Sequence, residues 1–134
     1  MPAETRVLAK SYLVTDEVAI HFMGPGVVPV LSTPALLMWM EMTSWENVRP
    51  LLRAGEDTVG LSVELKHLAA TPVGMTVRIV SRLVRTEGRI YTFAVEAFDA
   101  FDKVGEATHQ RASIQVAKFA GRIKFKQERA KSTE

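Results

Sequence analysis

Three polar side chains whose types could do chemistry, Thr33, Glu41 and His67, lie in segments that are otherwise apolar. Glu41 follows the run ALLMWM, where burying an unpaired carboxylate would be costly. A carboxylate can act as a nucleophile or a general base, and a histidine can exchange protons near neutral pH. A threonine hydroxyl can donate or accept a hydrogen bond beside them. These residues are therefore candidates for acid–base or nucleophilic catalysis.

Each of the three residues also has a structural interpretation. A buried glutamate can be satisfied by hydrogen bonds within the core, and a lone histidine on an apolar strand face is usually a core residue. Thr33 precedes Pro34, which favours an extended residue before it and suits the first position of a helix. We therefore expect Thr33 to be the N-cap of a helix, with a hydroxyl that can also face a ligand.

Two later residues are candidates for binding rather than for bond making. Gly60 interrupts an apolar strand, which indicates either a bulge or a close approach of the backbone. In the second case its amide could donate to an oxyanion. Arg111 lies in a late strand-like segment, where it could pair with a carboxylate or hold a substrate group.

One long helix within residues 32–53 must position Glu41. Its first turns are apolar on nearly every side, and such a helix must be buried. Trp45 lies one turn after Glu41 on the same face, whereas Glu46 lies on another face and is expected to be solvated. Pro50 cannot continue the helix because it lacks an amide hydrogen, so we predict that the helix ends just before it.

The apolar pattern then changes from a helical period to alternation. One strand face is predicted to carry Val59, Leu61, Val63, Leu65 and His67, with Gly60, Ser62, Glu64 and Lys66 on the other. Further strand-like segments cover residues 8–14, 76–86, 89–101 and 104–119. The apolar segment 16–31, rich in Gly and Pro, is either a lid or a loop packed on the core. One helix and five strands in this order predict an α+β fold with an antiparallel sheet.

Composition indicates one domain over residues 1–134, with residues 120–134 as a flexible basic tail. Residues 68–134 carry 12 Lys/Arg against 7 Asp/Glu, an excess that a solvated tail largely explains. The chain has no cysteine, and its three histidines lack metal-ligand spacing, so we predict no metal site. We find no signal-like segment, membrane span or nucleic-acid motif. A cytoplasmic protein without membrane or nucleic-acid partners is expected.

The central helix constrains how the sheet is arranged. A helix that is apolar on nearly every side needs more than one flat sheet face to cover it. Either the sheet curls around the helix or a second subunit covers the remaining side. Both features are typical of the hotdog fold, in which an antiparallel sheet of about five strands wraps around one long central helix.

The chain resembles the hotdog-fold thioesterases of the fluoroacetyl-CoA thioesterase group from about residue 33 to residue 119. The resemblance is carried by the segments TPALLMWMEM, GLSVELKHLAATPVGMTV, RTEGR and GEATHQRA. The spacing of Thr33, Glu41 and His67, eight residues and then 26, also matches the family's catalytic threonine, glutamate and histidine.

This resemblance implies that Thr33, Glu41 and His67 carry catalysis, and that Gly60 and Arg111 contact the substrate or coenzyme A. It also implies a homodimer whose two sheets join, with the sites at the subunit interface. No cofactor is implied beyond the coenzyme A of an acyl-CoA substrate.

One segment departs from that family. Its fluoroacetyl-specific members carry aromatic residues in the loop before the helix, whereas GPGVVPVLS has none and Phe22 lies several residues too early. We predict an acyl-CoA thioesterase acting on a small or short-chain acyl group, and we do not carry the fluoroacetyl specificity across. Two alternatives stay open: a hotdog acyl-CoA hydratase or dehydratase, and a non-catalytic module that binds acyl-CoA or another metabolite.

Overall fold

A computed structural model describes residues 6–133 of the chain. The predicted domain of residues 1–134 therefore includes residues 1–5 and 134, which lie outside the described part. In chain order the elements are β1 (Arg6–Leu13), the 3₁₀ helix η1 (Asp16–Val18), β2 (Ala19–Ile20), β3 (Val30–Leu31), α1 (Thr33–Val48), η2 (Arg49–Leu51), β4 (Glu56–His67), β5 (Thr76–Glu87), β6 (Ile90–Phe98), β7 (Lys103–Gln115) and α2 (Val116–Ser132).

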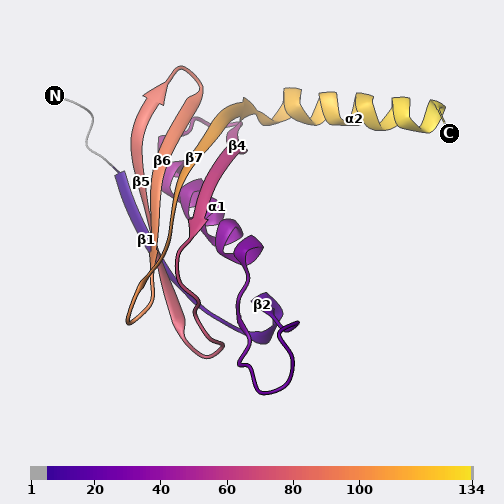
Figure 1. Ribbon diagram of the computed structural model, residues 1–134. Coiled ribbons are helices and arrows are strands. Elements are labelled where there is room, and N and C mark those ends of the chain that lie inside the picture. The colour runs from indigo at the N-terminus through magenta and orange to yellow at the C-terminus, as the bar shows by residue number, and fades with distance from the viewer. Residues whose placement is uncertain (1–5, 134) are drawn as a thin grey trace.

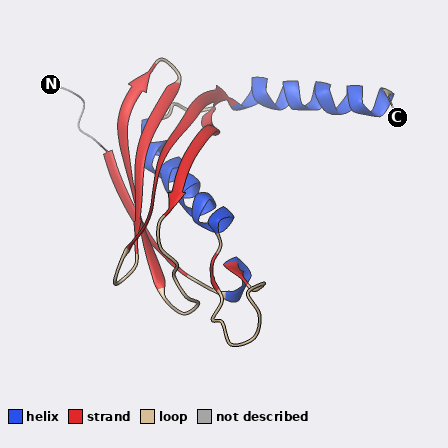
Figure 2. Cartoon of the chain, viewed as in Figure 1, coloured by secondary structure: helices blue, strands red, loops and turns tan. Residues whose placement is uncertain are grey.

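The five long strands form one antiparallel sheet in the order β1-β5-β6-β7-β4. Figures 1 and 2 show α1 lying across one face of this sheet, while α2 projects away from it. The core between α1 and the sheet includes Leu36, Met40, Ile79, Phe93 and Val95, each at most 1% exposed. The predicted α+β fold, with one helix against a five-stranded antiparallel sheet, is confirmed.

The two faces of α1 differ in exposure. The face against the sheet is buried and comprises Ala35, Leu36, Trp39, Met40, Thr43, Ser44, Asn47 and Val48. The opposite face carries Met38 and Met42, which are 47% and 45% exposed, on either side of Glu41. Within the single chain the sheet covers only one side of a helix that is apolar on both, so cover of the other side by a second subunit stays a prediction.

The start of α1 differs from the prediction by one residue. Ser32, not Thr33, is the N-cap, because its backbone is extended and its hydroxyl accepts a hydrogen bond from the Ala35 amide at 3.2 Å. Pro34 is compatible with both registers, since amides of the first turn lack intrahelical acceptors. The hydroxyl of Thr33 is consequently free of the capping role. At the other end α1 stops at Val48, just before Pro50, as predicted.

Strand β4 contains a bulge that changes which side chains share a face. Its pairing with β7 shifts between Gly60 and Ser62, so Leu61 is an extra residue and is 54% exposed. One extra residue reverses the alternation along a strand. Gly60 and His67 therefore both face α1, and the predicted placement of Gly60 on the face opposite His67 is wrong.

The apolar segment before α1 is partly ordered by the short β2–β3 pair, in which Ala19 pairs with Leu31 and Ile20 with Val30. Leu31 is 1% exposed, whereas Phe22 near the tip of the segment is 80% exposed. The base of this loop thus packs on the core, while its tip stays exposed near the start of α1.

The last predicted strand ends earlier than expected. Strand β7 stops at Gln115 instead of Phe119, because apolar residues 116, 119 and 123 follow a helical period. Helix α2 has no buried residue and takes up most of the predicted basic tail. Arg129 and Lys131 lie in its last turn, where cations interact favourably with the helix dipole. Across residues 6–133, no helix is both long and apolar enough to span a bilayer.

Candidate active site

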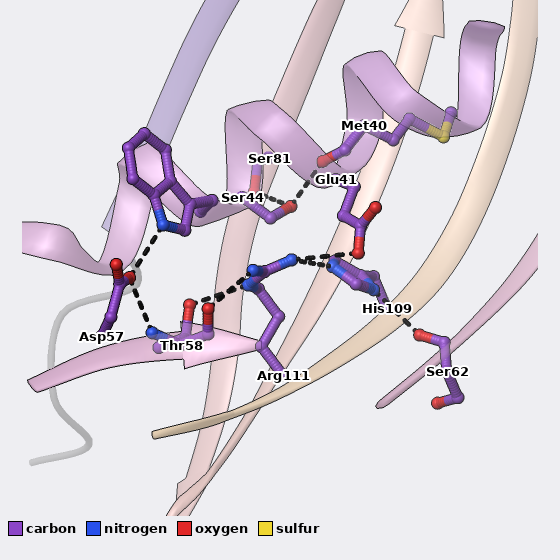
Figure 3. Close-up of polar contacts among 10 residues, drawn as sticks. Met40, Glu41, Ser44, Asp57, Thr58, Ser62, Ser81, His109 and Arg111 are labelled. Carbon is purple, nitrogen blue, oxygen red and sulfur yellow. Dashed lines mark hydrogen bonds and ion pairs between the residues drawn. The ribbon is translucent and has the colours of Figure 1, made fainter. Parts of the chain in front are cut away.

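Glu41 contacts Arg111 on the side of α1 that faces β4 and β7 (Figure 3). Nη1 of Arg111 lies 3.3 Å from Oε2 of Glu41. A Cβ atom placed on Gly60 would overlap the same carboxylate oxygen, so a side chain at this position requires Glu41 to move. The Glu41 carboxylate is therefore bordered by a guanidinium on one side and by bare backbone on another.

Thr58 of β4 fixes the guanidinium of Arg111. Nε of Arg111 donates to Oγ1 of Thr58 at 2.8 Å, and Nη2 donates to the Thr58 carbonyl oxygen at 3.0 Å. The side chain of Arg111 is 6% exposed, whereas that of Glu41 is 39% exposed. A buried guanidinium needs a negative partner. Glu41 supplies it while part of its carboxylate stays open to solvent.

A cavity of about 300 Å³ opens at this carboxylate. It is lined by Leu37, Glu41, Gly60, Leu61, Ser62 and Val63. Mostly apolar walls with a few convergent polar groups are typical of sites that bind small molecules.

A second polar cluster lies at the first turn of α1. Oγ1 of Thr33 and Nδ1 of His67 are 2.8 Å apart. Among the described residues, Nε2 of His67 is buried and has no hydrogen-bond partner. Both side chains line a cavity of about 420 Å³, together with Ile20, Phe22, Val30 and Leu68. A buried ring nitrogen without a partner beside a cavity is a candidate contact for a ligand.

Both histidines near these clusters are neutral at neutral pH. Burial lowers the pKa of His67 below its ordinary value of 6.5. Burial also lowers the pKa of His109 below 6.5, and the positive charge of Arg111 adds to the effect. The charged imidazole is disfavoured in each case because it loses hydration.

These lowered pKa values predict that the free energy of unfolding decreases on acidification. The unfolded chain protonates its histidines near pH 6.5, whereas the folded chain resists protonation of His67 and His109 to lower pH, so acid favours unfolding. This contribution is fully present above about pH 6.5 and is lost as the pH falls toward the lowered pKa values. Urea unfolding between about pH 7 and pH 5 measures the slope. The change of the free energy of unfolding with pH should be smaller in the double variant His67→Gln/His109→Gln than in the wild-type protein. Equal slopes in the two proteins would contradict the prediction.

The two clusters are separate within one chain. Glu41 lies eight residues after Thr33 on α1, which corresponds to about 12 Å along the helix axis. The structure brings Thr33 to His67, and Glu41 to Gly60 and Arg111, but the two groups line different cavities. One subunit alone does not assemble all the predicted residues around a single cavity.

Sequence analysis missed the residues that complete the Glu41 cluster, namely Thr58, Ser62 and His109. His109 could have been found from alternation, since Gly105, Ala107, His109 and Arg111 are the inward residues of β7. Thr58 and Ser62 gave no such signal, because the bulge in β4 disturbs the alternation between them. In the part of the chain that the structure describes, no three His, Asp or Glu side chains are grouped to hold a metal ion.

Two solved structures with this architecture come from thioesterases or their superfamily. A protein of Thermus thermophilus, a member of the thioesterase superfamily, superposes with a TM-score of 0.88 at 30% identity, over 96% of both chains. The fluoroacetyl-CoA thioesterase FlK superposes with a TM-score of 0.82 at 28% identity, over 91% of this chain and 95% of that chain. The fold and these two comparisons therefore place the protein among the thioester hydrolases with the hotdog fold.

Sequence comparison narrows this class to one family. Residues 14–117 match the family model of the fluoroacetyl-CoA-specific thioesterases. The fluoroacetyl-CoA thioesterase of Streptantibioticus cattleyicolor is 35% identical over 97 residues, which cover 72% of this chain and 70% of that protein. The chain belongs to the fluoroacetyl-CoA-specific thioesterase family. The predicted family, fold and class of enzyme are confirmed.

Proposed function

We propose that the protein hydrolyses a small or short-chain acyl-CoA to the free acid and coenzyme A, using Glu41 at the thioester carbonyl carbon. The observation that carries this proposal is the position of the Glu41 carboxylate, which Arg111 holds against Gly60 at a cavity. Family membership supports the proposal. A mutant of FlK has been crystallised in complex with fluoroacetate and CoA, which supports an acyl-CoA substrate.

Hydrolysis of a thioester requires an attacking group, a donor to the developing oxyanion and a proton for the departing thiolate. Glu41 supplies the first, either by forming a mixed anhydride that water then opens or by removing a proton from the attacking water. The amide of Gly60 is assigned as the oxyanion donor, because its backbone lies bare against the carboxylate. His67, hydrogen-bonded to Thr33, is assigned as a relay, whose neutral ring takes up a proton from water in the site and passes it to the departing thiolate.

A small acyl group is proposed because the cavity at Glu41 is only about 300 Å³ and is lined by residues 60–63 of β4 and by Leu37 and Glu41 of α1. The loop before α1 presents Val27 and Val28, which are 48% and 59% exposed, and no aromatic side chain follows Phe22 in it. Fluoroacetyl specificity is therefore not part of the proposal.

The test is release of free thiol from a panel of acyl-CoA thioesters, ranging from acetyl and small polar acyl groups to medium chains. We expect turnover on the short members and a decline with chain length. Consumption of an enoyl-CoA without thiol release would instead identify a hydratase. Tight binding of coenzyme A without turnover of any thioester would identify a binding module.

We further propose a homodimer, because the surface around Glu41 is apolar and β4 is an edge of the sheet. Met38, Met42 and Leu61 are each at least 45% exposed near this carboxylate. Clustered exposed apolar side chains indicate an interaction surface. In the described part of the chain β4 pairs only with β7, so its other edge is available to a second copy.

The proposed dimer would unite the two polar clusters. Antiparallel pairing of β4 with its copy, about a two-fold axis at Glu64 and with the bulge residue Leu61 unpaired, would place His67 of one subunit opposite Gly60 of the other. Glu41 lies beside Gly60, so each site would combine Glu41 of one subunit with His67 of its partner. Sedimentation velocity tests the dimer itself, and a monomer would contradict it.

Complementation tests whether the sites are shared between subunits. Glu41→Gln and His67→Gln are each expected to inactivate the homodimer. After mixing and subunit exchange, half of the dimers would be heterodimers with one intact site, so activity should return to about one quarter of wild type. No recovery, with heterodimers shown to form, would mean that Glu41 and His67 act within one chain.

A further inference from the structure

His109 is buried between the strands that border Glu41 and has no part in the chemistry assigned above. Its side chain is fully buried and lies on β7, two residues before Arg111. Its Nδ1 lies 2.8 Å from the Ser62 carbonyl oxygen, and its Nε2 lies 3.2 Å from Nη1 of Arg111 (Figure 3). The ring also stacks on Phe93, with 6.0 Å between the ring centroids.

These partners determine the tautomer of His109. A carbonyl oxygen only accepts hydrogen bonds, so Nδ1 must carry the proton that is donated to Ser62. A guanidinium only donates hydrogen bonds, so Nε2 must offer its lone pair to Nη1 of Arg111. A proton on Nε2 would point at an N–H group of a cation. Only the neutral imidazole can therefore make both contacts.

The hydrogen bond between His109 and Arg111 involves the same guanidinium nitrogen that contacts Glu41. Nη1 of Arg111 is shared, because it lies 3.3 Å from Oε2 of Glu41 and 3.2 Å from Nε2 of His109. Thr58 accepts from Nε and Nη2, so within residues 6–133 the acceptors that orient Nη1 are Glu41 and His109. A buried N–H group without an acceptor is costly, and the guanidinium would shift to find one.

The hydrogen bond between His109 and the Ser62 carbonyl oxygen affects the Glu41 site through β4. Ser62 directly follows the bulge residue Leu61, and this bulge turns Gly60 toward Glu41. A bulge interrupts the backbone hydrogen bonds between two strands. A side-chain hydrogen bond to a carbonyl oxygen at the bulge replaces one of them and fixes the local backbone. His109 therefore connects both structures that border the Glu41 carboxylate.

We propose that His109 is a positioning residue for thioester hydrolysis: it directs Nη1 of Arg111 to Glu41 and anchors the β4 bulge that brings Gly60 to the same carboxylate. The inference rests on the proposed function of the Glu41 site. His109 touches no reacting atom and acts through Arg111 and the backbone. The charged groups that face its ring are Arg111 and Glu41, and the lowered pKa of His109 agrees with a neutral ring.

Three variants separate the two contacts of His109. His109→Phe keeps a ring against Phe93 but removes both hydrogen bonds, and it should lower kcat about 100-fold with KM changed less than about threefold. His109→Gln keeps an acceptor for Arg111 and His109→Asn keeps a donor for Ser62, so each should recover part of the loss. His21→Gln, at an exposed histidine, is the control and should leave kcat unchanged. A wild-type kcat in folded His109→Phe would overturn the proposal.

A double-mutant cycle distinguishes positioning from a general structural role. If His109 acts through the guanidinium, His109→Phe should lower kcat about tenfold or less when Arg111 is already replaced by lysine. A loss of about 100-fold in both backgrounds would overturn the proposal, because the two residues would then act independently.

A measurement without substrate separates this inference from the proposed reaction. Long-range ¹H–¹⁵N spectra of the ¹⁵N-labelled protein report imidazole tautomers directly, and His109 should be the neutral Nδ1–H form at about pH 7 and above. An Nε2–H tautomer or a charged ring would overturn the inference. Failure of the wild-type protein to release thiol from any acyl-CoA would overturn the proposed function instead, with this spectrum unaffected.

Discussion

Glu41→Gln is expected to lower kcat for acyl-CoA hydrolysis about 10³-fold. Glutamine keeps the length of the side chain and an oxygen that can accept from Arg111, but it cannot attack the thioester or take a proton. Alanine is the poorer test, because it would remove the carboxylate that lies 3.3 Å from the buried guanidinium of Arg111 and leave that charge without a negative partner. The measurement is steady-state thiol release on the best substrate of the panel, with folding checked by circular dichroism.

Glu46→Gln is the matched control on the same helix. Glu46 forms an ion pair with Lys10 at 2.9 Å, and both side chains are 38% exposed. A surface pair of this kind contributes little to stability, and Glu46 does not line the cavity at Glu41. The control should keep wild-type kcat. Comparable activity in Glu41→Gln and Glu46→Gln would remove Glu41 from the reaction and leave it as a structural partner of Arg111.

Gly60→Ala is expected to lower kcat about 10²-fold to 10³-fold while leaving most of the fold intact. The added methyl group would occupy the position of Oε2 of Glu41, so the carboxylate must move away from both Gly60 and Nη1 of Arg111. A displaced carboxylate no longer meets the thioester in a reactive geometry. The change also crowds the amide that is assigned to the oxyanion.

Gly121→Ala is the control for replacing a glycine by alanine at a position outside the candidate site. Gly121 lies in α2, and a Cβ atom there would meet nothing within 4 Å. Alanine in an exposed helix position should raise helix stability slightly and leave kcat unchanged. A Gly60→Ala enzyme with wild-type kcat and a well-formed Glu41–Arg111 pair in its crystal structure would contradict the close approach described above.

The residues of the chain already determined the class of fold. The helical run around Glu41 and the alternation after Gly55 require one buried helix and several strands, because each pattern can hide its apolar side chains in only one kind of element. The sequence also indicated Glu41 as a functional residue, because a carboxylate within an apolar run needs a hydrogen-bond or ion-pair partner. That partner, Arg111, lies 70 residues further along the chain.

The contacts between distant segments were decided only by the tertiary structure. A single extra residue at Leu61 reversed the predicted face of Gly60, and local alternation cannot reveal a bulge in advance. A shift of one residue in the helix cap released the hydroxyl of Thr33 to His67, because Pro34 fits two registers equally well.

The roles of His109 and Arg111 likewise depend partly on the local sequence and partly on the tertiary structure. Their inward placement follows from the alternation of β7, which is a local property. Which groups they meet depends on how β4 pairs with β7 and on where α1 crosses the sheet, and both are set by packing over the whole domain. The sequence by itself therefore determined which elements form and which side chains point inward. The pairing of strands and the crossing of the helix decided that Glu41 would lie between a guanidinium and a bare backbone, because such contacts form only when distant segments pack together.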